Sequence, residues 1–270
     1  MCELFGMSSR IPASVDFSLD EFARHGGLSA PNSDGWGAAF YEGKAVRLIR
    51  EPEPAANSRY VRFIESHGFG GKIVLSHIRH ATQGAVTLAN TQPFGRELGG
   101  RAHIFAHNGD LAGLLEDERF ELTFSRPMGD TDSEHAFCAL LTRLAKLWSA
   151  SEVPPPEARF ELLVAFAGDL REKGPANFLY SDGELLFVHG HLRRQLPELP
   201  FEPPGLWMLH RHCPDEPHVI QIPGMRVSSE GGQEVRLFAS VPLSEENWQP
   251  VASGECIGAV DGDLRFRRTP

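Results

Sequence analysis

The stretch "NFLYSDGELLFVHG" (residues 177–190) is the clearest sign of the fold, because two apolar runs flank a single Asp-Gly pair. Such a pair predicts a β-hairpin, since a tight type I′ turn needs residues that tolerate positive φ. The same pattern recurs in "AAFYEGKAVRLI" around Glu42-Gly43 and in "CIGAVDGDLRFR" around Asp261-Gly262. Three hairpins spread along the chain predict antiparallel sheet.

Two further apolar runs predict buried strands that end in polar residues. They are "KIVLSHIRHA" (72–81) and "RAHIFAHNGD" (101–110). Functional residues are often placed where a strand gives way to a loop. We therefore expect side chains with a functional role just beyond both strands.

Helices are fewer. The clearest begins near Asp132, where apolar residues recur at steps of three and four, and Thr131–Glu134 has the form of a capping box. A second helix is predicted over 157–172, after three consecutive prolines, and weaker patterns indicate helices at 18–25 and 54–66. Strands mixed with helices, without strict alternation, favour an α+β or a layered α/β fold that contains an antiparallel sheet.

Composition restricts the classes of function. The 270 residues suit one large domain or two small ones, and we expect one domain over residues 1–270. A net charge of −10 argues against a nucleic-acid surface, which needs a basic face. The sequence has neither a secretory signal pattern nor an apolar run of about 18 residues, so we expect no membrane span.

The four cysteines, Cys2, Cys138, Cys213 and Cys256, are widely spaced, which is typical of a protein of the reducing cytoplasm. One stretch, "HRHCPDEPH" (210–218), could suggest a metal through its histidines and cysteine. Its spacing matches no standard metal-ligand pattern, so we expect neither a metal nor a cofactor.

Four polar clusters stand out. They are "NSDGWG" (32–37), "SHIRHATQG" (76–84), "FAHNGD" (105–110) and "GDTDSE" (129–134). Each has an ordinary structural interpretation. In the first, Gly35-Trp36-Gly37 could simply allow two backbones to pack closely beneath an indole. In the last, the three acidic residues could suggest a metal, but at a helix start they would not all face one point.

The functional interpretations of the other clusters are more specific. Arg79 near a strand end is either paired structurally or grips a carboxylate with two N–H groups. Asn108-Gly109 is either a simple turn or a pair of donors to one developing oxyanion. Asp132 is either a favourable first-turn residue of a helix or a carboxylate directed at an ammonium group.

Cys2 completes the set, because removal of Met1 would give this cysteine a free α-amine. A thiol nucleophile, a carboxylate grip, an ammonium partner and an oxyanion pair are together complementary to an amino acid with a side-chain amide. The sequence therefore predicts a site for glutamine or another γ-glutamyl compound.

At these residues the chain resembles the class II glutamine amidotransferases, which are N-terminal-nucleophile hydrolases. Several motifs match in order and spacing across about the first half of the chain, and the Asp-Gly-Trp-Gly form is most similar to the stand-alone, YafJ-like branch. The matching motifs are Met1-Cys2, Asp34-Gly35-Trp36-Gly37, Arg79-His80-Ala81-Thr82-Gln83-Gly84, Asn90-Thr91-Gln92-Pro93, His107-Asn108-Gly109 and Thr131-Asp132-Ser133-Glu134.

The resemblance implies a four-layer αββα sandwich with two stacked antiparallel sheets. It implies that Cys2 is the nucleophile and that Asn108 and Gly109 form the oxyanion hole. Arg79 would hold the substrate α-carboxylate and Asp132 its α-ammonium. The remaining pocket residues would be His80, Thr82 and Gln83; the positions of His80 and Gln83 often carry Trp and His in the sugar-aminating members.

The resemblance also implies a lid, for which the candidates are residues 8–10 and the loop around 26–34. In the mechanism the terminal amine takes the thiol proton, since the two groups have similar pKa values, and a thioester with Cys2 is then hydrolysed. Three functions are consistent with the sequence: a glutamine amidotransferase or glutaminase, a hydrolase of another γ-glutamyl amide, or a catalytically silent binding domain. Residues after about 150 carry no phosphate-binding motif, so either a separate protein receives the ammonia or none does.

Overall fold

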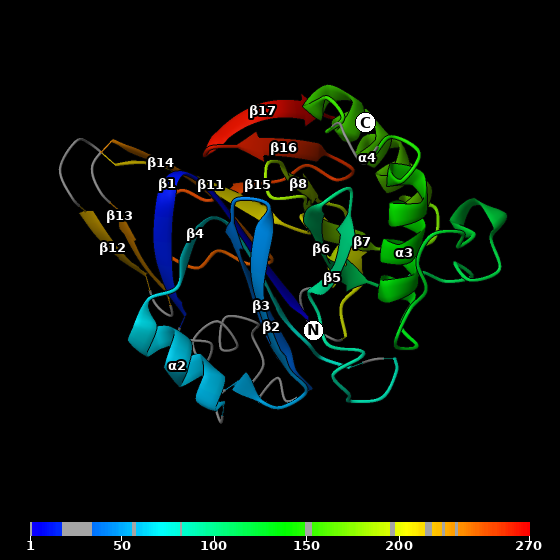
Figure 1. The fold of residues 1–270 in the computed structure, drawn as a ribbon, viewed down its shortest axis with the longest axis horizontal. Helices are drawn as coiled ribbons and strands as arrows, with labels where there is room; N and C mark the ends of the chain where they lie inside the picture. Colours follow the sequence, from blue (N-terminus) through cyan, green and yellow to red (C-terminus); the bar gives the residue numbers. More distant parts are fainter. Residues whose placement is uncertain are drawn as a thin grey trace.

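The computed structural model describes residues 2–17, 34–55, 58–81, 83–148, 153–194, 198–213, 218–222, 225–229 and 232–270. Within them the chain forms four layers, with two antiparallel sheets stacked between helices (Figure 1). Helix α2 (Arg59–His67) lies on the outer side of one sheet, and α3 (Asp132–Leu144) and α4 (Pro156–Arg171) cover the other. The predicted α+β sandwich is confirmed.

The larger sheet has nine strands in the described part of the chain, and its central path runs β15-β11-β14-β1-β4-β2-β3. Strand β13 also pairs with β1, and β12 pairs with β13. The bounds are β1 Glu3–Phe17, β2 Trp36–Glu42, β3 Ala45–Glu51, β4 Gly70–Ile78, β11 Trp207–Cys213, β12 His218–Ile222, β13 Met225–Ser229, β14 Gln233–Ala239 and β15 Gln249–Pro250.

The smaller sheet has six strands in the order β17-β16-β8-β7-β6-β5. A short pair, β9 with β10, and one 3-10 turn, η2, lie outside both sheets. The bounds are β5 Phe94–Leu98, β6 Arg101–Gly109, β7 Ala176–Ser181, β8 Leu186–His189, β9 Arg193–Arg194, β10 Phe201–Glu202, β16 Cys256–Val260, β17 Asp263–Arg268 and η2 Glu118–Phe120.

All three predicted hairpins form, but their turns differ. At Asp261-Gly262 both residues have positive φ, 50° and 81°, as a type I′ turn requires. The other two turns were predicted wrongly in detail. Glu42 pairs with Ala45, so that turn is centred on Gly43-Lys44. The hairpin between Ser181 and Leu186 has a four-residue loop, in which Asp182 Oδ1 accepts hydrogen bonds from two backbone N–H groups.

The predicted helices at 132 and 157–172 are confirmed as α3 and α4, whereas the helix predicted at 54–66 begins only at Arg59. The prediction at 18–25 lies outside the described residues. Only half of the predicted capping box forms. Thr131 accepts a hydrogen bond from Glu134 N, but the Glu134 carboxylate binds Arg96 and the N–H of Gly129.

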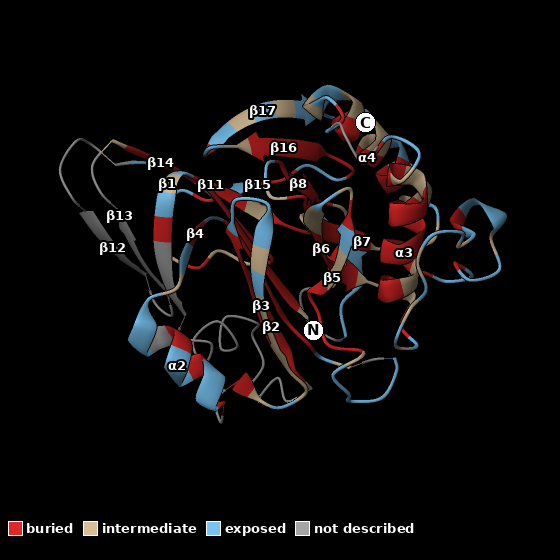
Figure 2. Cartoon of the chain, viewed as in Figure 1, coloured by how far each residue is buried: buried red, intermediate tan, exposed pale blue. Residues whose placement is uncertain are grey.

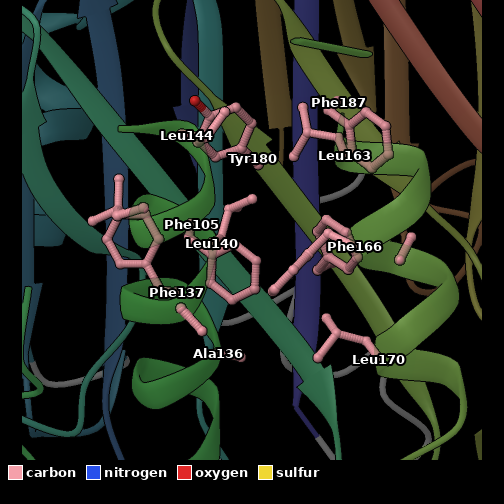
Figure 3. Packing of buried hydrophobic residues seen from close by; sticks show 14 of the residues in the cluster. Phe105, Ala136, Phe137, Leu140, Leu144, Leu163, Phe166, Leu170, Tyr180 and Phe187 are labelled. Carbon is pink, nitrogen blue, oxygen red and sulfur yellow. The ribbon is translucent and has the colours of Figure 1, made fainter. Parts of the chain in front are cut away.

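Apolar residues form three layers of core (Figure 2). Alternate residues of the sheets fill the space between them, as the two-residue period of a strand requires. The aromatic-rich layer lies between the smaller sheet and the two covering helices, where Phe137 of α3 stacks on Phe105 of β6 with ring centroids 5.4 Å apart (Figure 3). Burial of one such side chain contributes roughly 1.5–3 kcal/mol to stability.

Candidate active site

The register of the larger sheet brings three motifs to the same sheet end. Glu3 of β1 and Trp36 of β2 both pair with Ile78 of β4, on opposite sides of that strand. Cys2 therefore lies just before β1, where β4 ends and β2 begins. The blue beginning of β1 lies between the strands around β2 and those around β5 in Figure 1.

Cys2 is half-buried and contacts segments from both sheets. The peptide N–H of His80 lies 3.2 Å from Cys2 Sγ, and the thiol donates to the carbonyl oxygen of the same residue at 3.3 Å. The side-chain amide of Asn108, at the end of β6, donates to the carbonyl oxygen of Cys2 at 2.6 Å. The predicted neighbours of Cys2 thus meet at one point.

Burial raises the pKa of the Cys2 thiol, while the hydrogen bond from the His80 backbone and the charge of Arg79 act in the opposite direction. A thiol with a raised pKa is mostly protonated near neutral pH. Chemistry at this sulfur therefore requires a nearby base to remove the proton.

Arg79 is buried, and its guanidinium holds the loop that follows β4. It donates to the carbonyl oxygens of Gln83 at 2.8 Å, Gly84 at 3.1 Å and Ala85 at 3.1 Å. A guanidinium carries five N–H groups, so these contacts do not exhaust its donors. Arg79 therefore has a structural role in holding this loop, and its grip on a substrate carboxylate stays a prediction.

Of the three other pocket residues, the structure describes two. The exposed imidazole of His80 lies 3.8 Å from the carboxylate of Asp34. The amide of Gln83 donates to Asp110 Oδ1 at 3.0 Å, which joins the Arg79 loop to the end of β6. Thr82 lies outside the described residues. The contacts of His80 and Gln83 with a substrate stay predictions.

The backbone at Gly109 has no room for a side chain, because a Cβ atom there would overlap the carbonyl oxygen of Pro175. Two residues before Gly109, the backbone N–H of His107 donates a hydrogen bond to the amide oxygen of Gln92 at 2.6 Å. The imidazole of His107 is 2.9 Å from Ser133 Oγ, on helix α3. The Asn108-Gly109 corner is therefore held from three sides, as an oxyanion site would require.

Asp132 is the first residue of α3 and is half-buried. Its Oδ2 accepts a hydrogen bond from Leu111 N at 2.8 Å, and its Oδ1 accepts one from Ser133 N at 2.6 Å. A carboxylate in the first helical turn is stabilised by the helix dipole. Asp132 thus lies close to the end of β6, while its role toward an ammonium group stays a prediction.

Three residues of the quoted motifs have structural contacts at the site although no role was predicted for them. Asp34 Oδ2 accepts a hydrogen bond from Ala81 N at 2.8 Å, and Gly35 O accepts one from Arg79 N at 2.8 Å, so this pair of residues supports the segment that contacts the thiol. Asn90 joins two loops through its side chain. A carboxylate beside Gly in a loop is the signal that could have found Asp34.

Two segments, residues 8–10 and the loop around 26–34, were predicted as candidate lids. Residues 8–10 cannot form the predicted lid, because they lie within β1, where Ser8 and Ser9 are buried. The other lid candidate, around 26–34, falls outside the described residues except for Asp34.

In the histidine-rich stretch 210–218, His210 and His212 both bind the carboxylate of Glu234.

Within the described ranges, no group of three or more His, Cys, Asp or Glu side chains is arranged to hold a metal ion. No helix in this part of the chain is both long enough and apolar enough to span a membrane.

The four-layer αββα fold, with Cys2 just before its central strand β1, agrees with the fold expected from the sequence motifs. A sequence profile of glutamine amidotransferases class-II matches residues 1–270. The chain belongs to the class II glutamine amidotransferase family.

Known proteins agree with this assignment. The chain is 36% identical over 267 residues to YafJ of Escherichia coli K12, which is named as a candidate glutamine amidotransferase, and the match covers 96% of this chain and 98% of YafJ. A crystal structure of a predicted glutamine amidotransferase from Pseudomonas aeruginosa PA01 superposes with a TM-score of 0.71 at 33% identity, covering 98% and 99% of the two chains.

The glutamine phosphoribosylpyrophosphate amidotransferase of B. subtilis shares the fold alone. Its TM-score is 0.59 at 15% identity, and the match covers 98% of this chain and 48% of that one.

Proposed function

We propose that this protein hydrolyses the side-chain amide of glutamine, or of a closely related γ-glutamyl compound, with Cys2 as its N-terminal nucleophile. The observation that carries the proposal is the position of Cys2, whose thiol contacts the His80 peptide and whose carbonyl oxygen accepts a hydrogen bond from the Asn108 amide. We further propose that residues 1–270 act as one domain, since the last strand, β17, belongs to the same sheet as β6.

The chemistry starts with removal of Met1, which frees the α-amine of Cys2. This amine has an ordinary pKa of about 7.7–8.0, so part of it is unprotonated near neutral pH and can act as a general base. Because burial raises the pKa of the thiol, proton transfer to the amine is uphill and accompanies the attack of the sulfur. The sulfur attacks the γ-carbonyl carbon of the substrate, and the carbonyl oxygen becomes an oxyanion. The protonated amine then gives its proton to the departing nitrogen, and water hydrolyses the thioester to release glutamate.

The oxyanion is stabilised by Asn108 and Gly109. An amide nitrogen carries two hydrogens, and Asn108 Nδ2 uses one on Cys2 O, so the other is free for the substrate within the described contacts. One such donor typically lowers the barrier by roughly 2.7–4 kcal/mol. The amino-acid end of the substrate is held by Arg79 through its α-carboxylate and by Asp132 through its α-ammonium.

Intact-protein mass spectrometry and an amidase assay together test the proposal. We expect the purified chain to lack Met1 and to release glutamate from glutamine. We expect Cys2→Ala to abolish turnover while still binding glutamate, because the binding groups are separate from the nucleophile. Cys138→Ala, which removes a buried thiol elsewhere, is the matched control and should keep its turnover.

A chain that retains Met1, or a Cys2→Ala variant with normal turnover, would rule out Cys2 as the nucleophile. A panel of γ-glutamyl amides in the same assay compares glutamine with other leaving amines. Turnover of another γ-glutamyl amide far above that of glutamine would instead identify a γ-glutamyl amidohydrolase with a different substrate.

A further inference from the structure

Asn90 is a buried residue, 2% exposed, whose side chain lies between two loops of the candidate site. Its Nδ2 donates to Ala85 O at 3.0 Å and to Asp130 Oδ1 at 2.5 Å. Its Oδ1 accepts a hydrogen bond from Asp130 N at 3.0 Å. One amide therefore joins loop 83–85 to loop 129–131, with all of its polar atoms in use.

Each of these loops is attached to one of the two charged groups of the site. The Arg79 guanidinium donates to three carbonyl oxygens of loop 83–85, and it shares Ala85 O with Asn90. On the other side, Asp130 comes two residues before Asp132, at the start of α3. The Asn90 side chain is thus a short, direct link between the Arg79 loop and the Asp132 loop.

Both loops carry a glycine where they approach the Asn90 amide. A Cβ atom on Gly84 would lie 2.8 Å from Asp130 Oδ1 and 3.0 Å from Asn90 Nδ2, and Gly84 also has a positive φ of 73°. A Cβ atom on Gly129 would overlap Asn90 Oδ1. The close approach of both backbones to one amide therefore depends on glycine at these two positions.

The two charged groups belong to different layers of the fold. Arg79 follows β4 of the larger sheet, and Asp132 begins a helix that covers the smaller sheet. No single strand or helix fixes the distance between them. The α-carboxylate and α-ammonium of an amino acid, in contrast, are attached to one carbon atom, so their separation is nearly constant.

We propose that Asn90 is a positioning residue that sets the spacing between the Arg79 guanidinium and the Asp132 carboxylate to fit the two charges of an α-amino acid. The inference rests on the proposed function, because it assumes that these two groups bind the substrate. The inference adds that Arg79 and Asp132 can bind both charges of one amino acid only while the Asn90 amide joins their loops.

Ligand discrimination separates this role from a merely structural one. L-Glutamate carries both α charges, whereas glutarate has the same chain length without the α-ammonium. With the spacing intact, glutamate should bind at least about tenfold more tightly than glutarate, because roughly one hydrogen bond to a charged group is worth that much. Loss of the spacing should weaken glutamate binding and leave glutarate binding nearly unchanged.

The experiment measures the Kd of L-glutamate and of glutarate by titration calorimetry, with the full chain and its Asn90→Ala variant. The matched control is Gln233→Ala. Gln233 is also a fully buried amide with paired hydrogen bonds, to the N–H and C=O of Ile11, but it joins β14 to β1 away from the site. We expect Asn90→Ala to reduce the preference for glutamate to below about threefold, and Gln233→Ala to keep it.

Failure of the inference and failure of the proposed function give different results. If the unaltered chain binds glutamate no better than glutarate, the proposed function is wrong in its substrate. If the unaltered chain discriminates and Asn90→Ala discriminates equally well, the positioning role is wrong and the proposed function stands.

A second pair of variants keeps the test decisive if Asn90→Ala fails to fold. Asn90→Asp places a second carboxylate against Asp130 and should abolish the preference for glutamate. Adding Asp130→Asn restores a donor and an acceptor in the same place, and should recover at least part of the preference. Absence of any recovery would contradict a direct link through these two side chains.

Discussion

Two histidine-containing stretches of this chain look alike in sequence, and the structure uses them differently. The stretch 76–84 ends at the same sheet end as Cys2, whereas 210–213 lies farther along the larger sheet. His210 is level with Ser8 of β1 through their shared neighbour Arg236. Ser8 is six positions from Cys2 along the chain, which is about 20 Å of extended strand.

The difference lies in what the polar side chains bind. In the first stretch, Arg79 donates to backbone carbonyls of its own loop, and the His80 backbone contacts a thiol from another strand. In the second, His210 and His212 both bind the carboxylate of Glu234, so the polar groups satisfy one another. A cluster can act on a ligand only where its groups are organised by the backbone and are left with donors or acceptors to spare.

The largest effect should come from Gly109→Ala at the site. The new Cβ atom would overlap the Pro175 carbonyl, so the end of β6 must move and carry Asn108 with it. We expect turnover to fall at least about a hundredfold, as for loss of an oxyanion donor, and the melting temperature to drop.

The matched control is Gly168→Ala, within helix α4, where the nearest atom would lie 3.9 Å away. Alanine in a helix interior should raise stability by about 0.5–1 kcal/mol. Normal kinetics in Gly109→Ala would mean that this corner does not take part in catalysis.

The next largest effect should come from Arg79→Lys. A lysine ammonium cannot reproduce the planar set of donors that reaches Gln83, Gly84 and Ala85, so the loop loses its support along with the charge geometry. We expect KM for glutamine to rise by roughly tenfold or more, because hydrogen bonds to charged groups are worth about 1.5–3 kcal/mol. Steady-state kinetics measure the change, and an unaltered KM would make Arg79 purely structural.

Acid should destabilise the fold through its buried histidines. Burial lowers the pKa of His77 and of His189 to about 3 and that of His103 to about 4, well below the usual 6.5. As the pH falls from about 6.5 to 4, the unfolded chain binds protons that the folded chain does not. Stability should therefore fall across this range, with each group contributing up to roughly 1.4 kcal/mol per pH unit.

Denaturant titrations between pH 4 and pH 8 measure this dependence. A His77→Gln variant should show a shallower loss of stability toward low pH than the unaltered chain. An equally steep loss in the variant would show that His77 becomes protonated without unfolding.

The smallest effect should come from Glu234→Gln in the second stretch. Burial acts to raise the pKa of this carboxyl, but hydrogen bonds from His212 and His210 hold it below its usual range. Partly exposed ion pairs are worth about 0–1 kcal/mol, so the free energy of unfolding should change by no more than that. Turnover should stay the same, and a large loss of turnover would mean that the two stretches are coupled.

The hairpins, the two long helices and the polar ends of β4 and β6 could be predicted because their signals are local. Asp-Gly turns and three-to-four-residue apolar spacing depend on neighbouring residues only. The centre of the turn at Gly43-Lys44 could not be predicted, because it depends on the register in which β2 pairs with β3. The missing half of the capping box could not be predicted either, because tertiary packing gives Glu134 the partners Arg96 and Gly129. The lid at 8–10 was predicted wrongly for the same reason.

The sequence by itself determined which residue types are present, in which order, and that the chain forms antiparallel sheets with helices on their faces. Only the tertiary structure decided that Cys2, His80 and Asn108 meet, and that the Asn90 amide joins two loops from different layers. The physical reason is range. Backbone geometry and side-chain periodicity act over a few residues. Apart from the Asn90–Ala85 hydrogen bond, these contacts join residues 40 to 106 positions apart, and sheet register and layer packing bring them together.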